Sequence, residues 1–256
     1  MRVWAVANQK GGVGKTTTAV TLGGLLADQG QRVLLLDLDP HGSMTSYFGY
    51  DPDTLQKSSF NLFASNNATV AEIQSLLLAT PCQNLSLLPS SMALATVERR
   101  AAAEGMGLKV AKALSLIWDY YDYVLIDSPP VLGALMINAL AASERLLIPV
   151  QTEFLALKGL ERMMRTIQMV TRSLKKELQY LIVPTLFDRR TQASIKTLRT
   201  LRNSYPDEIW PAMIPVDTRF RDASREGVTP SQFSAQSRGV VAYRALLKYL
   251  LLQQRL

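Results

Sequence analysis

The feature that most constrains this chain is an eight-residue segment near its start, Lys10-Gly11-Gly12-Val13-Gly14-Lys15-Thr16-Thr17. It follows an apolar run with β-strand character, residues 3–7, and precedes a stretch with helical spacing, residues 18–26. A strand, a glycine-rich loop and a helix in this order favour phosphate binding, because backbone N–H groups close around phosphate oxygens and the helix N-terminus adds partial positive charge. We therefore predict that this loop binds a nucleotide. Lys15 is expected to reach the β- and γ-phosphates, and the Thr16 hydroxyl to ligate Mg²⁺.

The loop departs from the common phosphate-loop template, which places a glycine five residues before its last glycine. Gln9 occupies that position, and a second lysine, Lys10, follows it. The loop carries Lys10 away from the phosphates that it flanks, so this cation makes best chemical sense if it crosses to another subunit. A solvated surface lysine is the alternative that spacing alone leaves open.

Three carboxylates stand directly after apolar runs of β-strand character. Asp37 and Asp39 follow the run 33–36, and Asp127 follows the run 123–126. Because the carboxyl ends of parallel strands converge on the ligand crevice of an α/β sheet, these side chains are expected to face the phosphate loop. Carboxylates there hold Mg²⁺ through water or position the attacking water. A single aspartate after a strand is commonly a turn former, but three beside a phosphate loop indicate a nucleotide hydrolase.

Strand-like and helical segments alternate along the chain, as a parallel α/β sheet requires. Right-handed crossovers then favour a doubly wound, mostly parallel sheet flanked by helices. At 256 residues, one domain spanning residues 1–256 is expected. The irregular stretch 43–80 is predicted to contain short helices at 58–63 and 70–77. The other predicted elements are strands at 3–7, 33–36, 85–88, 124–126, 145–150 and 180–185, and helices at 107–120 and 158–174.

Composition limits the class of protein. The single cysteine, Cys82, cannot form an internal disulfide and cannot hold a metal cluster alone. No cationic segment followed by an apolar stretch opens the chain, and no run approaches 18 apolar residues. A cytoplasmic globular enzyme is the simplest interpretation.

Charge is divided unevenly between the two parts of the chain. Residues 1–154 carry 10 Lys+Arg against 13 Asp+Glu, whereas residues 155–256 carry 18 against 8. A basic part on an otherwise acidic fold is expected of a protein that binds nucleic acid or anionic lipid. Without an evident recognition helix, binding to nucleic acid is expected to involve phosphates and to be indifferent to sequence. A solvated basic face is the alternative.

Taken together, these motifs resemble the ParA/MinD-type ATPases, the deviant Walker A branch of P-loop NTPases. The chain is most similar to small, Soj-like ParA proteins that lack an N-terminal DNA-binding extension. The similar segments lie nearly end to end, at residues 7–18, 37–40, 127–130, 137–140, 149–153, 185–188 and 214–215.

The resemblance implies a role for each matched site residue. Lys10 would reach across an ATP-sandwiched homodimer to the partner's phosphates, and Asp39 would position the attacking water. Asp127 would be the Mg²⁺-associated Walker B acid, and Asp37 would lie near the metal. The backbone and side chains of Gly11, Gly12, Val13, Gly14, Lys15, Thr16 and Thr17, together with Pro215, would hold the nucleotide. The family usually carries glutamine where this chain has His41, which we expect to be an exposed loop residue with a possible tuning role.

The same resemblance implies a positioning function. ATP would close two subunits, the dimer would bind nucleoid DNA without sequence preference, and a partner protein would stimulate hydrolysis. Arg219 is the first expected DNA contact, followed by Arg221, Arg225 and Arg238. The cargo would be a chromosome or plasmid partition complex or a chemotaxis array, and residence at the nucleoid or a cell pole would follow.

Two other function classes stay open at this point. A MinD-like regulator would bind membrane through a C-terminal amphipathic helix, but the last helical stretch, residues 240–252, is apolar on much of its circumference. That pattern favours packing on the domain over binding to lipid. A small-molecule synthetase of the cobyrinic acid or dethiobiotin type is the third possibility, although no motif for a substrate carboxylate is evident.

Overall fold

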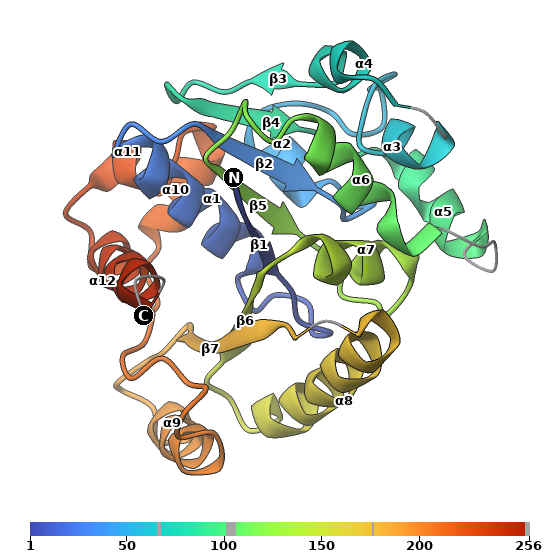
Figure 1. Ribbon diagram of the computed structural model, residues 1–256. Helices are drawn as coiled ribbons and strands as arrows, with labels where there is room; N and C mark the ends of the chain where they lie inside the picture. The colour runs from blue at the N-terminus through green and yellow to red at the C-terminus, as the bar shows by residue number, and fades with distance from the viewer. Residues whose placement is uncertain (66–67, 101–105, 176, 254–256) are drawn as a thin grey trace.

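The computed structural model describes residues 1–65, 68–100, 106–175 and 177–253. Within them, one seven-stranded sheet has the order β3-β4-β2-β5-β1-β6-β7 (Figure 1). Every neighbouring pair of strands is parallel except β3 and β4. The strands are β1 Arg2–Val6, β2 Val33–Asp37, β3 Leu78–Ala79, β4 Leu85–Leu88, β5 Tyr123–Asp127, β6 Arg145–Gln151 and β7 Gln179–Thr185.

Helices cover both faces of this sheet (Figure 1). Successive residues of a strand point to opposite faces, so Val3 and Ala5 join a core with α6, α7 and α8, whereas Trp4 and Val6 join a core with α1 and α12. The helices are α1 Lys15–Ala27, α2 Ser43–Tyr47, α3 Asn61–Ala64, α4 Val70–Ser75, α5 Ala95–Arg100, α6 Lys109–Leu116, α7 Ala134–Ala142, α8 Ala156–Leu174, α9 Gln192–Ser204, α10 Arg219–Arg225, α11 Pro230–Ser234 and α12 Arg238–Gln253, with single 3₁₀ turns at Met92–Leu94 and Met106–Leu108. The predicted doubly wound α/β class is confirmed.

Strand register brings the predicted site to one edge of the sheet. β5 lies between β1 and β2, and Asp127 stands opposite both Val6 and Asp37. The segment that follows β1 is the glycine-rich loop. Because these three strands end at the same level, the loop and the carboxylates meet at the carboxyl edge, where α/β sheets bind ligands.

All six predicted strands are present, and the short antiparallel β3 was not predicted. The predicted helix 107–120 is shorter than expected, since α6 ends at Leu116 and residues 117–120 form a turn. Leu116, Trp118 and Tyr120 are exposed. Their apolar side chains continued the helical spacing in the sequence and so led to a predicted helix that was too long. Of the two short helices predicted in the excursion, α3 and α4 form, and α2 was missed.

The C-terminal helix α12 packs on the sheet as predicted. Val240, Tyr243, Leu246, Leu247 and Leu250 are buried on its inner side. The hydroxyl of Tyr243 lies 2.8 Å from Oγ1 of Thr18 in α1. This helix therefore supports the helix that follows the glycine-rich loop. No helix in the described ranges is long and apolar enough to cross a membrane.

Candidate functional site

The glycine-rich loop after β1 owes its shape to backbone conformation. Gly12 and Gly14 have φ values of 73° and 89°, in the left-handed region that residues with a β-carbon seldom adopt. A β-carbon at either position would meet open space, so the requirement for glycine comes from φ. The loop is anchored at its middle, where the Thr185 hydroxyl at the end of β7 donates to the carbonyl oxygen of Val13 at 2.8 Å.

Lys15, the first residue of α1, is buried and turned back over the loop. Its Nζ donates to the carbonyl oxygen of Lys10 at 3.3 Å. Burial lowers the pKa of Lys15, while the charges of Asp127 and Asp39 raise it. A desolvated ammonium beside the backbone N–H groups of a glycine-rich loop is suited to binding phosphate oxygens.

Thr16 and Asp127 are joined directly, as their predicted shared role requires. The Thr16 hydroxyl donates to Oδ2 of Asp127 at 2.5 Å. The other carboxylate oxygen, Oδ1, is buried and has no hydrogen-bond partner among the described residues. Burial raises the pKa of Asp127, and the nearby charge of Asp37 raises it further. An orphaned oxygen on a destabilised carboxylate, beside a hydroxyl, fits a hard divalent cation with its water shell.

Asp37 is also buried, but both of its oxygens are engaged. Oδ1 accepts from the backbone N–H of Asp39 at 3.1 Å, and Oδ2 accepts from the N–H and the hydroxyl of Thr45 at 2.9 and 2.8 Å. Burial raises the pKa of Asp37. In the described ranges, no three His, Cys, Asp or Glu side chains are grouped to hold a metal. Because both oxygens of Asp37 already accept hydrogen bonds, this side chain is suited to act on a cation through water.

Asp39 is held at the solvent edge of the site. Its Oδ1 accepts from the backbone N–H of His41 at 3.1 Å and lies 2.9 Å from Nδ1 of the same residue. Its carbonyl oxygen accepts from the Ser90 hydroxyl at 2.5 Å, and the Ser90 N–H donates in turn to Oγ1 of Thr45. The prediction that His41 is exposed is confirmed, but its contact with Asp39 was not foreseen.

Lys10 forms an ion pair with Glu153 of its own chain. This partner was not predicted from the sequence. Glu153 could have been recognised from its position, because it follows a predicted strand, as Asp37 and Asp127 do. Because β6 lies beside β1 in the sheet, a carboxylate after β6 falls next to the loop after β1. To reach another subunit, as predicted, Lys10 would first have to break its ion pair with Glu153.

A cavity of about 780 Å³ lies over this loop. Asp39, His41, Pro215 and Arg221 line it together with the loop. Arg221, predicted from sequence as a DNA contact, thus stands at the cavity of the glycine-rich loop. The other lining residues are Ser43, Pro130, Thr185, Leu186, Ile214, Val216, Asp217, Thr218, Phe220 and Tyr243.

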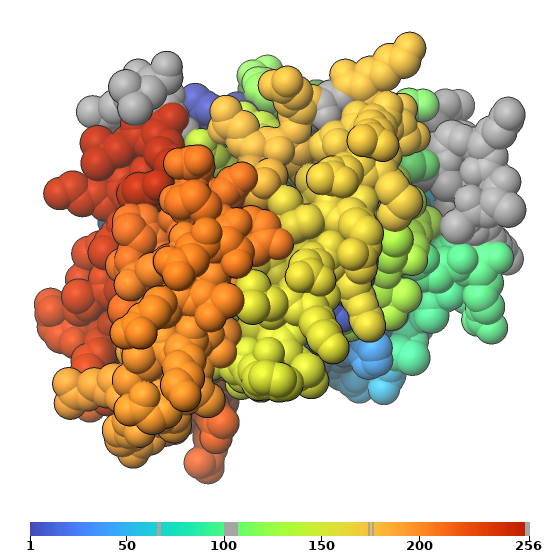
Figure 2. All heavy atoms as spheres, turned by 90° about the horizontal axis from the view of Figure 1, so that it is seen from below, coloured from blue at the N-terminus to red at the C-terminus, as the bar shows by residue number. Residues whose placement is uncertain are grey.

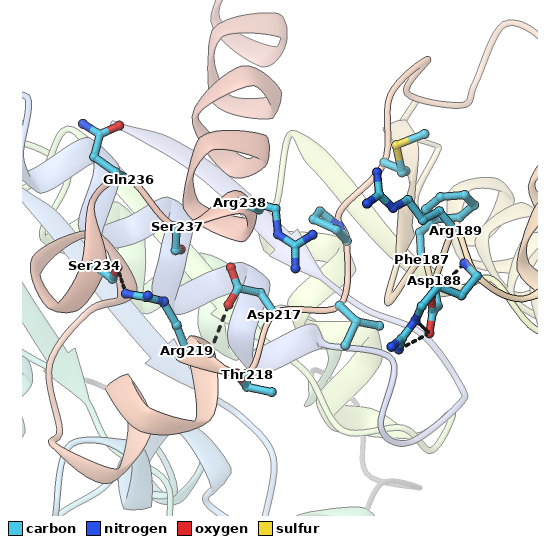
Figure 3. A pocket seen from close by; sticks show the side chains of 14 residues that line it. Phe187, Asp188, Arg189, Asp217, Thr218, Arg219, Ser234, Gln236, Ser237 and Arg238 are labelled. Atoms are coloured by element: carbon cyan, nitrogen blue, oxygen red, sulfur yellow. Dashed lines mark hydrogen bonds and ion pairs between the residues drawn. The ribbon is translucent and has the colours of Figure 1, made fainter.

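A second cavity, of about 860 Å³, shares the wall formed by residues 215–218 (Figure 3). Four arginines line it. Arg190 makes a bidentate pair with Asp188, and Arg219 donates to the Ser234 hydroxyl at 2.8 Å. Within the described part of the chain, no hydrogen bond or ion pair engages the side chains of Arg189 and Arg238. These two guanidinium groups, drawn in Figure 3, are thus available to an anion.

Further positive charge lies on α8 and α9, which are side by side on one face of the molecule (Figure 2, yellow and orange). The exposed cations of these helices are Lys158, Arg162, Arg165, Arg172, Lys196 and Arg199. Arg225, also predicted to contact DNA, is exposed at the last residue of α10 and lines neither cavity. The basic C-terminal part of the chain is therefore spread over separate surfaces.

Comparison with known proteins identifies relatives over nearly the whole chain. A family model described as an AAA domain matches residues 1–180. The sporulation initiation inhibitor protein Soj of Bacillus subtilis is 34% identical over 96% of this chain and 97% of its own length. The chromosome partitioning protein ParA of Caulobacter vibrioides is 34% identical over 100% and 96%. Among solved structures, cobyrinic acid a,c-diamide synthase of Mycobacterium smegmatis, with a bound ATP analog and magnesium, is 34% identical with a TM-score of 0.86, covering 100% of this chain and 96% of that one.

Proposed function

Because the chain belongs to the ParA/MinD family of P-loop ATPases, on its Soj-like branch, we propose that it is an ATP- and Mg²⁺-dependent dimerisation switch that hydrolyses ATP and positions a cargo on DNA. The observation that carries this proposal is the Thr16–Asp127 contact beside the buried Lys15. A phosphate-binding lysine, a metal-binding hydroxyl and a carboxylate with a free oxygen meet there at one edge of the sheet.

Each residue of the site has a distinct task in phosphoryl transfer. The backbone N–H groups of residues 11–17 and the ammonium of Lys15 bind the β- and γ-phosphates. Thr16 and Asp127 would hold a Mg²⁺ ion, with Asp37 acting through water, and the ion would supply positive charge to the phosphate oxygens. Asp39 lines the same cavity, where its oxygen Oδ2 can accept a hydrogen bond from water and orient that water toward the γ-phosphate.

Exposed apolar side chains around the site support closure of two subunits. Val131 and Leu132 follow β5, and Phe154 and Leu155 follow β6, on either side of the loop after β1. Val131 is 64% and Phe154 87% exposed. Large apolar residues gathered at one edge indicate a surface that becomes covered. In an ATP-bound homodimer these residues would pack together, and Lys10 would leave Glu153 for the phosphates of the partner subunit.

Non-specific DNA binding is proposed for the arginine-lined cavity and its surroundings. Among the described residues, no carboxylate forms an ion pair with Arg189 or Arg238, whereas Arg190 is already paired with Asp188. Arg219, Arg221 and Arg225 lie on the neighbouring helix α10. Guanidinium groups on several elements can contact successive phosphates of a duplex without reading its bases. ATP-dependent dimerisation would double the number of phosphate contacts, so the affinity for DNA would depend on ATP.

The cargo and the stimulating partner are further parts of the proposal. A chromosome or plasmid partition complex is supported by the partition proteins among the relatives, and a chemotaxis array is the alternative cargo. The partner would present a basic N-terminal peptide to the dimer. We also propose that residues 1–256 form a single ATPase domain, found in the cytoplasm at the nucleoid or a pole. The MinD-like membrane alternative is weakened by the packing of α12, whose apolar side is buried.

A second candidate activity follows from the solved relative that is named as a cobyrinic acid a,c-diamide synthase. Such an enzyme would use ATP to activate a substrate carboxylate. The arginine-lined cavity beside the nucleotide cavity is also compatible with a carboxylate-bearing substrate. The partition proposal differs because it predicts stimulation by DNA and a partner, with no other substrate required.

One experiment separates these proposals. Phosphate release from ATP and Mg²⁺ is measured alone, with duplex DNA, and with cobyrinic acid and glutamine, and the sedimentation coefficient is followed in the same solutions. We expect slow basal hydrolysis and an ATP-dependent dimer that sediments with DNA. Hydrolysis that begins only with the small-molecule substrate would identify a synthetase, and a chain that never releases phosphate would overturn the ATPase proposal.

A further inference from the structure

His41 is the only histidine of the chain, and it touches the residue proposed to orient the attacking water. Two groups of His41 converge on the same atom, Oδ1 of Asp39: the backbone N–H at 3.1 Å and ring Nδ1 at 2.9 Å. The imidazole side chain is 79% exposed, and the Asp39 side chain is 12% exposed. His41 therefore covers Asp39 from the solvent side, at the mouth of the cavity over the glycine-rich loop.

The two contacts have different consequences for the carboxylate. The terminal torsion of an aspartate is broad, because it joins an sp³ carbon to an sp² carbon. A backbone N–H alone fixes the position of one oxygen but leaves the plane of the carboxylate free to turn. A second donor on the same oxygen, from a different direction, restricts that rotation. Oδ2, which has no hydrogen-bond partner among the described residues, then keeps a defined direction at the cavity that Asp39 lines.

We propose that His41 is a positioning residue for hydrolysis: its Nδ1–H fixes the Asp39 carboxylate so that Oδ2 aims at the attacking water. The inference rests on the proposed ATPase function. Both the neutral ring protonated at Nδ1 and the charged ring supply the required donor. Since orientation of the water matters in the transition state and not in nucleotide binding, His41 should affect kcat and leave the KM for ATP unchanged.

Asparagine provides the decisive substitution. Its amide nitrogen occupies nearly the place of Nδ1, so His41→Asn keeps a donor for Oδ1, whereas His41→Ala removes it. Phosphate release is measured for both variants in the Asp39 and the Asp39→Ala backgrounds. We expect His41→Ala to lower kcat about tenfold, the size of a lost charge-assisted hydrogen bond, with KM unchanged. His41→Asn should recover most of that loss, and neither change should matter once Asp39 is alanine.

The outcomes distinguish this inference from the function on which it rests. Wild-type kcat in His41→Ala, an equal loss in His41→Asn, or a further loss on top of Asp39→Ala would each overturn the positioning role. A parent protein that does not hydrolyse ATP, or an Asp39→Ala variant as fast as the parent, would instead overturn the proposed function.

Discussion

Lys10 and Glu153 form an ion pair within one chain, joining the loop after β1 to the segment after β6. Their side chains are 33% and 38% exposed, so the pair is solvated and its contribution to stability is small. A contact of this kind can be exchanged at low cost. It keeps Lys10 in place until another anion competes for it, and in the proposed ATP-bound dimer the phosphates of the partner's nucleotide would be such anions.

We predict that Lys10→Ala binds ATP nearly as well as the parent but neither dimerises nor hydrolyses it. Glu153→Gln frees Lys10 and should raise the fraction of ATP-bound dimer. Nucleotide affinity by fluorescence and dimer fraction by sedimentation test both changes. Arg2→Ala is the matched control, because it breaks the exposed Arg2–Glu144 pair away from the site. A Lys10→Ala protein that turns over like the parent would make this lysine a surface residue.

Substitution of Lys15 and of Asp39 is expected to block different steps, ATP binding and ATP hydrolysis respectively. Lys15→Ala should abolish ATP binding, since the buried ammonium is the main positive charge of the loop. Asp39→Ala should keep ATP and accumulate as a dimer, because loss of a water-positioning group slows turnover by orders of magnitude without disturbing the binding loop. Sizing chromatography with ATP and Mg²⁺ measures both. A monomeric Asp39→Ala protein would contradict the switch.

DNA binding should depend on arginines that have no acidic partner. Arg219→Ala, Arg189→Ala and Arg238→Ala are each expected to lower affinity for all sequences alike while leaving ATP-driven dimerisation intact. Arg190→Ala, whose guanidinium is paired with Asp188, serves as the control and should change affinity least. With about three phosphate contacts per subunit, log affinity should fall with log salt at a slope of roughly −5 for the dimer and about half that for a monomer.

Gel-shift titrations at several salt concentrations, run beside liposome sedimentation, check this prediction. Tight liposome binding without a DNA shift would favour the membrane alternative. A loss in Arg190→Ala equal to that in Arg189→Ala would show that pairing with Asp188 does not decide which arginine binds DNA.

The buried carboxylates should make the nucleotide-free protein less stable at higher pH. Burial, and for Asp127 also the charge of Asp37, raises the pKa of both groups above their unfolded values. The folded state then binds more protons than the unfolded state, so the free energy of unfolding falls as pH rises from about 4 toward the folded pKa values. Asp127→Asn removes one of these charges and should stabilise the protein at pH 8, by on the order of 2 kcal/mol.

Thermal melts of parent and Asp127→Asn protein at pH 5 and pH 8 measure this effect. The gain in melting temperature should be larger at pH 8, and the variant should lose stabilisation by ATP and Mg²⁺. Equal gains at both pH values would mean that Asp127 is ionised in the folded protein over this whole range, and would contradict the raised pKa.

Much of the site was predictable because it is encoded locally. A phosphate loop is one continuous segment. Gly12 and Gly14 have positive φ values, and this local backbone conformation favours glycine whatever the rest of the fold. Asp37 and Asp127 were found by a similar rule, since each ends an apolar strand and parallel strands deliver their ends to one edge. The packing of α12 against the domain was predicted because its residues are apolar on much of the helix circumference.

Other parts of the site depend on which elements become neighbours. Glu153 reaches Lys10 because β6 lies beside β1. Arg221 lines the cavity over the glycine-rich loop because residues 209–216, which precede its helix, run parallel to β7 and to the residues that follow β7. Counting charges predicted that residues 155–256 are basic. Only the structure shows that Arg190 is paired with Asp188, whereas no described residue pairs with the Arg189 side chain. The sequence by itself determined the chemistry that each short segment can carry out. The tertiary structure alone decided which distant groups meet, such as Lys10 and Glu153 or Thr16 and Asp127, because strand order and loop packing bring together residues more than 100 positions apart.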